Sequence, residues 1–271
     1  MNTIFVNMSV GESPKSFLKG YLFLANVLNS AKIDKLVVPA IVQSGSTNVV
    51  LDCQYSVPDH HFTLQWWFSG GDAPVYEWTP PLAPRVTGIL KGRLDLSYKV
   101  SPLATEEYRA MRIFQVDPQL SGEYTCVVNY NGVKSQETKS MQVLAPEKEF
   151  ELLFELKFNR LVEVTCYAQS VHPQPDLTVE YNREPISQQT QRVWRRQNLL
   201  YDVESTAQLM VPECGDRLEV TCRLHLPQAD YTAIKRRLLH IGTLVPCNLG
   251  WKGNPSNIGF SLLILFVPIV F

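Results

Sequence analysis

The sequence has no excess of charge of either sign, because 25 basic and 26 acidic side chains leave a net charge of −1 over 271 residues. A broad basic surface is therefore not expected, and nucleic acid is not among the predicted partners. The chain also contains no Gly-x-Ser-x-Gly motif, no glycine-rich phosphate loop and no His-x-x-x-His pair. We therefore predict no catalytic residue, no cofactor and no enzyme activity.

Cysteine is present at only six positions, and no two of them form a Cys-x-x-Cys pair. No histidine lies at zinc-finger spacing from two cysteines, so no metal site is predicted. The even number of cysteines and their strand-like surroundings favour disulfides instead, and disulfides need an oxidising compartment. This indicates the extracellular side of the plasma membrane.

The first two cysteines lie in a recognisable pattern. Cys53 ends an alternating run, Trp66 follows, and Tyr124 stands two residues before Cys126. This Cys…Trp…Tyr-x-Cys arrangement is that of an immunoglobulin domain, in which a disulfide joins two facing strands. The arrangement therefore predicts an all-β sandwich with Cys53 linked to Cys126.

A second pair of cysteines repeats the pattern in a shorter form. Cys166 and Cys222 lie in cleanly alternating runs and are separated by 55 residues, whereas 72 residues separate the first pair. The difference matches about two strands of 5–6 residues with their turns, which variable-type domains have and constant-type domains lack. We therefore expect two tandem immunoglobulin-like sandwiches. The variable-like one covers residues 36–145 and the constant-like one covers 147–243, with Cys166 linked to Cys222.

Two cysteines remain, Cys214 before the strand of Cys222 and Cys247 beyond the last expected strand. The simplest pairing is a third disulfide, which would tie the linker over residues 244–257 to the second sandwich. A free thiol, or a bond to another chain, stays open as the alternative.

The N-terminal segment 1–31 resembles a signal peptide. Lys15 and Lys19 precede the apolar run of residues 21–28, and the small residues Ser30 and Ala31 follow it. A buried element is the alternative interpretation. The glycosylation sequon that begins at Asn7 lies inside this segment and is expected to be removed with it.

The last 14 residues, 258–271, are apolar and uncharged. As a helix they would span about 21 Å, which is less than the ~30 Å hydrocarbon core of a bilayer. An apolar tail after a polar stretch with small residues is typical of a GPI-anchor signal, and a short membrane-spanning tail is the alternative. The candidate attachment sites are Asn248, Gly253, Asn254 and Ser256.

Over residues 36–242 the chain is similar to two-domain cell-surface proteins of the immunoglobulin superfamily. The resemblance is carried by Cys53, Trp66, Tyr124, Cys126, Cys166, Pro173, Pro175 and Cys222. The stretch from Trp66 to Pro84 resembles the insect beaten-path family, which implies cell adhesion, axon guidance and a sidestep-like surface partner. The two-domain arrangement is also similar to B7 ligands, which implies an immune-type signalling ligand or co-receptor as the alternative.

Three positions depart from this pattern. Leu120 stands where many variable domains place an Asp, which puts the usual Asp–Arg surface pair in question. In the second sandwich Val179 takes the place of the core Trp, and Val220 takes the place of the Tyr before the second cysteine.

The candidate binding residues follow from strand alternation. If Trp66 points into the core, Trp67 must point to the opposite face of the sheet. An exposed Trp with aromatic neighbours is typical of an interface anchor. The alternative is that the proline-rich segment 80–84 folds over these aromatics as a local cover. The expected binding face consists of Gln65, Trp67, Tyr76, Trp78, Val127 and Asn129.

Basic residues gather at two places in the second sandwich. They could bind heparan sulfate or acidic lipid headgroups. A charged, solvated strand edge is the alternative that we prefer. The residues are Arg192, Arg195 and Arg196 around Trp194, and the run Lys235-Arg236-Arg237.

Overall fold

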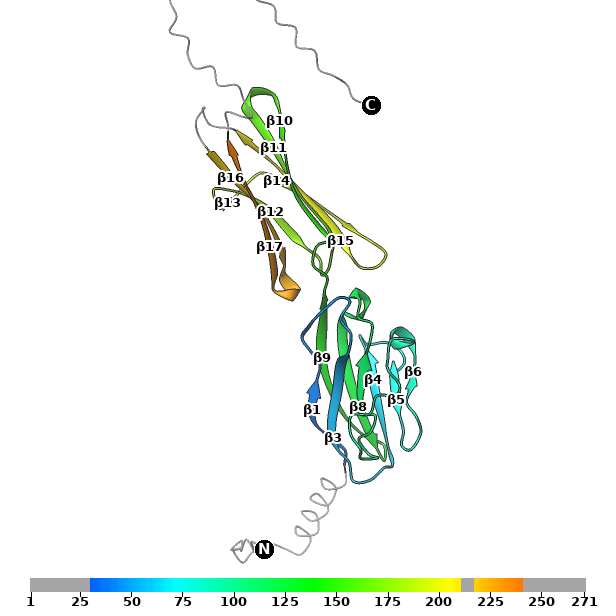
Figure 1. Ribbon diagram of the computed structural model, residues 1–271. Coiled ribbons are helices and arrows are strands. Elements are labelled where there is room, and N and C mark those ends of the chain that lie inside the picture. Colours follow the sequence, from blue (N-terminus) through cyan, green and yellow to red (C-terminus); the bar gives the residue numbers. More distant parts are fainter. Residues whose placement is uncertain (1–29, 211–216, 241–271) are drawn as a thin grey trace, which may run out of the picture.

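The computed structural model describes residues 30–210 and 217–240 and arranges them as two β-sandwiches in series (Figure 1). The first sandwich contains β1 to β9 and the second contains β10 to β17. Within the described ranges the regular elements are strands and short 3-10 helices. The predicted all-β fold of two tandem immunoglobulin-like sandwiches is confirmed.

The first sandwich pairs a three-stranded sheet with a six-stranded sheet. The small sheet has the order β1-β3-β7, and the large sheet has the order β2-β9-β8-β4-β5-β6. The short strands β5 and β6 extend the large sheet beyond β4, as the longer cysteine spacing predicted for a variable-like domain. The strands are β1 (Lys32–Val37), β2 (Ile41–Gln43), β3 (Val49–Ser56), β4 (Phe62–Phe68), β5 (Tyr76–Trp78), β6 (Arg85–Val86), β7 (Ala110–Ile113), β8 (Gly122–Tyr130) and β9 (Val133–Leu144).

The core of the first sandwich forms because every second side chain of β3, β4 and β8 points between the two sheets. Cys53 of β3 and Cys126 of β8 are bonded there, with Cα atoms 6.4 Å apart, and Trp66 is fully buried. The hydroxyl of Tyr124 donates a hydrogen bond of 2.9 Å to the Leu120 carbonyl. This is the tyrosine corner of immunoglobulin domains.

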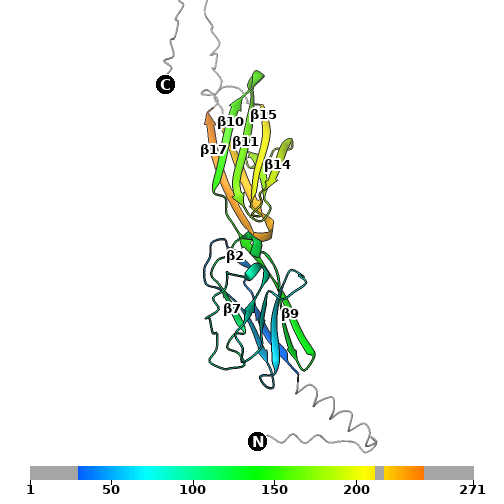
Figure 2. The same ribbon diagram turned by 90° about the vertical axis from the view of Figure 1, so that its right-hand side faces the viewer.

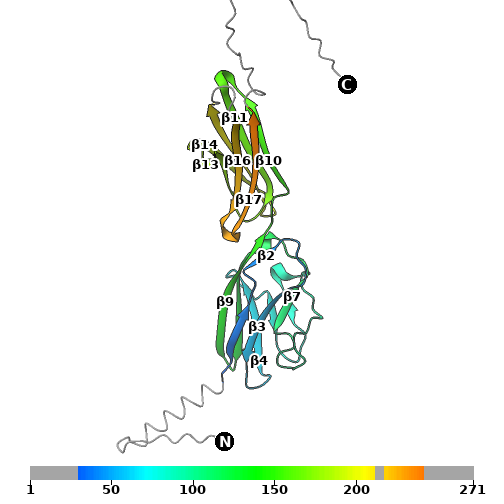
Figure 3. The same ribbon diagram turned by 60° about the vertical axis from the view of Figure 1, so that its left-hand side comes forward.

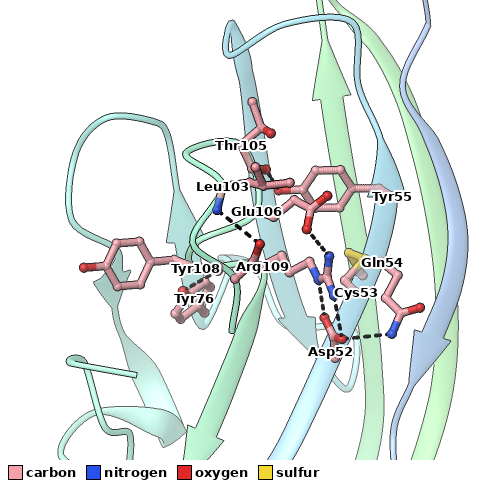
Figure 4. A network of polar contacts seen from close by, with 12 residues as sticks. Asp52, Cys53, Gln54, Tyr55, Tyr76, Leu103, Thr105, Glu106, Tyr108 and Arg109 are labelled. Atoms are coloured by element: carbon pink, nitrogen blue, oxygen red, sulfur yellow. Dashed lines mark hydrogen bonds and ion pairs between the residues drawn. A yellow bond between two sulfur atoms is a disulfide. The ribbon is translucent and has the colours of Figure 1, made fainter. Parts of the chain in front are cut away.

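A polar cluster fastens the long connection before β7 to the small sheet (Figure 4). Arg109 Nε lies 3.0 Å from Asp52 Oδ1 of β3, and Arg109 Nη1 lies 2.6 Å from Glu106 Oε2. The Tyr55 hydroxyl donates to the Thr105 carbonyl at 2.9 Å. β3 therefore holds the connection through the side chains of Asp52 and Tyr55.

The second sandwich pairs two four-stranded sheets, of order β10-β11-β15-β14 and β13-β12-β16-β17. Cys166 of β11 and Cys222 of β16 are bonded, with Cα atoms 5.7 Å apart. β14 lies at the edge of the sheet with β10, β11 and β15, which is the constant-type arrangement. The strands are β10 (Glu149–Leu156), β11 (Leu161–Val171), β12 (Asp176–Tyr181), β13 (Glu184–Pro185), β14 (Gln189–Arg195), β15 (Tyr201–Met210), β16 (Arg217–Leu226) and β17 (Tyr231–His240).

Two glutamines of β14 reach across to the opposite sheet. Because β13 is only two residues long, it leaves backbone N–H groups of β12 without a ladder partner. Gln191 Oε1 accepts from the Leu177 N–H at 2.9 Å, and Gln189 Oε1 accepts from the Val179 N–H at 2.8 Å. These amides replace a missing strand along the edge of β12.

The two sandwiches lie end to end (Figures 2 and 3). His172 contacts residues of both, and this contact region is called the joint. β9 ends at Leu144, β10 begins at Glu149, and Ala145 exchanges two backbone hydrogen bonds of 2.9 Å with His172. The Nδ1 of His172 lies 2.8 Å from the Leu199 carbonyl in the second sandwich. Its Nε2 lies 3.1 Å from Ser121 Oγ in the first.

Burial of the His172 ring lowers its pKa, since the charged form loses water. The contacts of the ring fit the neutral form. Nδ1–H donates to the Leu199 carbonyl, and Nε2 accepts at 3.2 Å from the Gln142 amide, whose nitrogen also donates to the Val143 carbonyl. One imidazole thus links the two sandwiches through its two nitrogens.

Candidate functional site

The surface of the six-stranded sheet that points away from the core is called the outer face here. Its side chains alternate with the core residues of the same strands, and the strand register places them in rows. The outer face consists of Thr63, Gln65, Trp67, Glu77, Arg85, Thr125, Val127, Asn129, Lys134, Gln136 and Thr138.

Trp67 lies at one end of the outer face and is half-buried. Its cross-strand partner is Thr125 of β8, which in turn faces Thr138 of β9. The hydroxyl groups of these two threonines lie 2.8 Å apart and form a hydrogen bond. The indole therefore sits beside a small, fixed polar row, with part of its ring open to solvent.

A chain of polar contacts crosses the middle of the outer face. The Gln65 amide donates to Glu77 Oε2 at 2.7 Å, and Arg85 Nη2 donates to Glu77 Oε1 at 3.0 Å. Both carboxylate oxygens of Glu77 are therefore engaged on the surface of β5. The next residue in the row is Val127, which points outward but is only 7% exposed. An apolar centre thus lies beside an ordered polar strip.

Asn129 lies in the row nearest the β8–β9 turn. Its partners in register are Thr63 and Lys134, and its side-chain oxygen is covered without a hydrogen-bond partner within the described part of the chain. Beside it a shallow hollow of about 260 Å³ is lined by His60, His61, Phe62, Thr63, Thr79, Pro80, Asn129, Asn131 and Gly132. The outer face therefore continues into the loops at the free end of the first sandwich.

The expected placement of Tyr76 and Trp78 on this face is wrong. In the register of β4 and β5, Tyr76 faces Trp66 and Trp78 faces Leu64, so both aromatic rings lie in the core. They are 3% and 1% exposed. The outward residue of this short strand is Glu77, because cross-strand partners point to the same side of a sheet.

Polar atoms of the two rings are satisfied inside the protein. The Tyr76 hydroxyl donates to the Tyr108 carbonyl at 2.7 Å, and burial raises the pKa of this phenol. Trp78 Nε1 donates to the Leu82 carbonyl at 3.0 Å. The proline-rich segment 80–84 therefore folds back onto Trp78, and the predicted cover applies to that residue.

The four other predicted binding residues, Gln65, Trp67, Val127 and Asn129, are all on the outer face. Sequence reasoning missed Glu77 and Arg85, although the pattern Tyr-Glu-Trp carried a signal. In a strand with one buried face, a charged residue between two aromatic residues points outward and the two aromatic side chains point inward.

Within the described part of the chain, Arg192, Arg196 and Lys235 of the two basic clusters are paired with acidic residues. Arg196 Nη2 lies 2.5 Å from Asp202 Oδ2, and Arg192 Nη1 lies 3.8 Å from Glu204 Oε1. Lys235 contacts the Phe150 carbonyl and the Glu151 carboxylate of β10. These neutralising contacts favour the charged strand edge over a polyanion site.

Residues 30–210 and 217–240 contain no group of three or more His, Cys, Asp or Glu placed to hold a metal.

Several predictions concern residues outside the described ranges. They are the signal peptide apart from its last two residues, the sequon at Asn7, the third disulfide of Cys214 and Cys247, the linker over 244–257 and the tail over 258–271. Within the described ranges, no helix has the length and apolar character needed to cross a membrane. No further Asn-x-Ser/Thr sequon with x other than Pro occurs in the sequence.

Comparison with known proteins finds the fold but no relative in sequence. No family model matches the chain, and no curated protein is similar to it in sequence. The crystal structure of bovine butyrophilin matches with a TM-score of 0.61 and 14% identity, covering 77% of this chain and 97% of the solved butyrophilin chain. A chain in the crystal structure of ICOS with ICOS-L and an anti ICOS-L VNAR domain matches with a TM-score of 0.55 and 16% identity, covering 73% and 97%.

These likenesses establish a two-domain immunoglobulin-type fold, and both solved proteins belong to the immunoglobulin superfamily. They give no support to the resemblance to the insect beaten-path family. At 14% and 16% identity they carry no residue-level information about the outer face.

Proposed function

We propose that this protein is an extracellular recognition protein that binds another cell-surface protein through the outer face of its first sandwich. The observation that carries the proposal is Trp67, a half-buried indole on an outward sheet face. Around it lie the buried Val127 and the ordered Gln65–Glu77–Arg85 strip. Protein interfaces of this kind combine a few aromatic anchors with polar groups already held in place.

The second sandwich serves as a spacer in this proposal. The two disulfides fit an oxidising, extracellular location. The C-terminal segment attaches the chain to the membrane, either through a GPI anchor that replaces the apolar tail over 258–271 or through that tail as a short span. Binding is reversible and involves no chemistry, so no catalytic residue is assigned.

An immune-type ligand or co-receptor of B7-like type is favoured over a guidance protein. The support is the architecture shared with butyrophilin and with a chain from the complex of ICOS with ICOS-L. Neither neighbour speaks for neuronal guidance or a sidestep-like partner. Under this proposal, cells that carry the receptor respond when they meet cells displaying this protein.

The test is a screen of cells displaying the full chain against a library of soluble surface ectodomains. The hit is then measured against Trp67→Ala, with Trp194→Ala as the matched control. Trp194 is 46% exposed but lies on the second sandwich. Loss of an aromatic anchor costs 2 kcal/mol or more, so the affinity is expected to fall about thirtyfold or more.

Surface display should stay the same for both variants, because neither indole is part of the buried core. Equal affinity of Trp67→Ala and the wild-type chain would contradict the assignment of the binding face. A hit whose binding is lost only with Trp194→Ala would move the site to the second sandwich.

A further inference from the structure

The end of the second sandwich that points away from the first carries an unusual group of exposed apolar side chains. Phe158, in the 3-10 turn η3 (Phe158–Arg160) between β10 and β11, is 93% exposed. Met210 is 68% exposed and Leu156 is 44% exposed. Arg160 and Arg217 are exposed at the same end. These five residues are called the far tip.

The strand directions put these residues together. β10 begins at Glu149, next to the joint, so its last residue Leu156 lies at the opposite end of the sandwich. In the ladders Leu156 pairs with Val162, and Leu161 pairs with Met210. Among the described residues, the three views agree that the β10–β11 connection lies at the end farthest from the first sandwich (Figures 1, 2 and 3).

The chain continues toward its apolar tail from this same end. β17 starts at Tyr231, whose hydroxyl donates to Glu147 beside the joint, and it ends at His240, which pairs with Arg217. Of the 31 residues that follow, the last 14 are uncharged and apolar. The 17 residues between can reach at most about 60 Å. A bilayer to which the C-terminal segment is attached therefore lies within reach of the far tip.

The chemistry of the far tip suits the boundary between lipid headgroups and acyl chains. Phe158 presents nearly its whole ring to solvent, which is costly in water and favourable at that boundary. Arginine beside it can donate to lipid phosphate, while its aliphatic stem stays with the apolar chains. Lys157 is already engaged, with Nζ lying 2.8 Å from Glu155 and 3.3 Å from Glu163. Arg160 and Arg217 are exposed and remain available for lipid phosphate.

We propose that the far tip docks on the phospholipid bilayer to which the C-terminal segment is attached, with Phe158 inserted among the lipids and Arg160 and Arg217 on lipid phosphate. The inference rests on the membrane attachment in the proposed function. Docking at this second point, beside the tail, fixes the tilt of the second sandwich. The outer face of the first sandwich is then held away from the membrane, at the other end of the molecule.

The test places a photo-crosslinking phenylalanine analogue at position 158 of the full chain on intact cells. The matched control carries the same analogue at Phe114, which is 44% exposed on the first sandwich. After irradiation, phospholipid adducts are counted by mass spectrometry. Adducts at position 158 are expected to exceed those at 114 by about tenfold or more, the ratio that corresponds to about 1.4 kcal/mol.

Three results overturn the proposal, and each is distinct. If the protein is bound to cells but position 158 gives no lipid adducts, the docking of the far tip is contradicted and the membrane attachment is not. Crosslinks from 158 to another protein assign the far tip to a protein partner. If the protein is found only in the medium, both the membrane attachment and the docking are contradicted. Partner binding through Trp67 is measured separately and does not depend on any of these outcomes.

Discussion

The core position of Trp78, which was expected on the outer face beside Trp67, gives a sharp test of the fold around the site. Trp78 is 1% exposed, and its ring centroid lies 5.7 Å from both Phe62 and Tyr108. Its Nε1 donates to the Leu82 carbonyl. Removing a buried Trp side chain costs about 3–5 kcal/mol, and that range includes the cavity left behind.

For Trp78→Ala we therefore expect the free energy of unfolding of the first sandwich to fall by about 4 kcal/mol. With a urea dependence of about 2 kcal/mol per molar, the unfolding midpoint falls by about 2 M. The midpoint is followed by circular dichroism of the purified chain, with Trp67→Ala as the control, for which a loss below ~1 kcal/mol is expected. An unchanged midpoint for Trp78→Ala would refute the core placement, as would a loss of ~4 kcal/mol for Trp67→Ala.

Two further predictions concern the second sandwich. Because burial depresses the pKa of His172, the unfolded chain binds more protons than the folded one below about pH 6.5, the ordinary value for His. The stability contributed at the joint is therefore present near neutral pH and declines as the pH falls below that value. The urea midpoint should drop over this range, and less so in His172→Gln; equal slopes would contradict the neutral joint. Gln189→Ala leaves the Val179 N–H and the Ser205 hydroxyl without their partner, so we expect a loss of about 1–3 kcal/mol in thermal unfolding. An unaltered transition would show that water replaces the amide at no cost.

The alternation of side chains made the cores of both sandwiches predictable. Val162, Val164 and Cys166 of β11 alternate with polar residues in the sequence and are buried in the structure. The same rule separated Trp66 from Trp67. It worked because a strand with one buried face must repeat every second residue, whatever its partners are.

Placement failed where a contact depends on residues far apart in the sequence. Leu120 replaced the expected Asp, yet an Asp–Arg pair is present, between Asp117 and Arg93 at 2.9 Å. The pair of Asp52 and Arg109 joins residues 57 positions apart. No local sequence pattern predicts such pairs, because they depend on how distant parts of the chain pack together.

The contacts of His172 at the joint could not be predicted from the sequence either. Its ring nitrogen meets Ser121 and Gln142, which precede it by 51 and 30 positions. In the sequence His172 is one of five scattered histidines with no motif around it. Its role arises from the end-to-end packing of two sandwiches that each fold by their own pattern.

The central claim, that the outer face of the first sandwich contacts the partner, is most directly tested with a glycan placed on that face. Gln136→Asn creates an acceptor sequon with Thr138, and both residues are exposed on β9. Gln188→Asn creates one with Thr190 on the second sandwich and is the matched control. With glycan occupancy verified by mass, the first variant is expected to lose partner binding on cells, while the control keeps it. Full binding by the glycosylated Gln136→Asn protein would contradict the account.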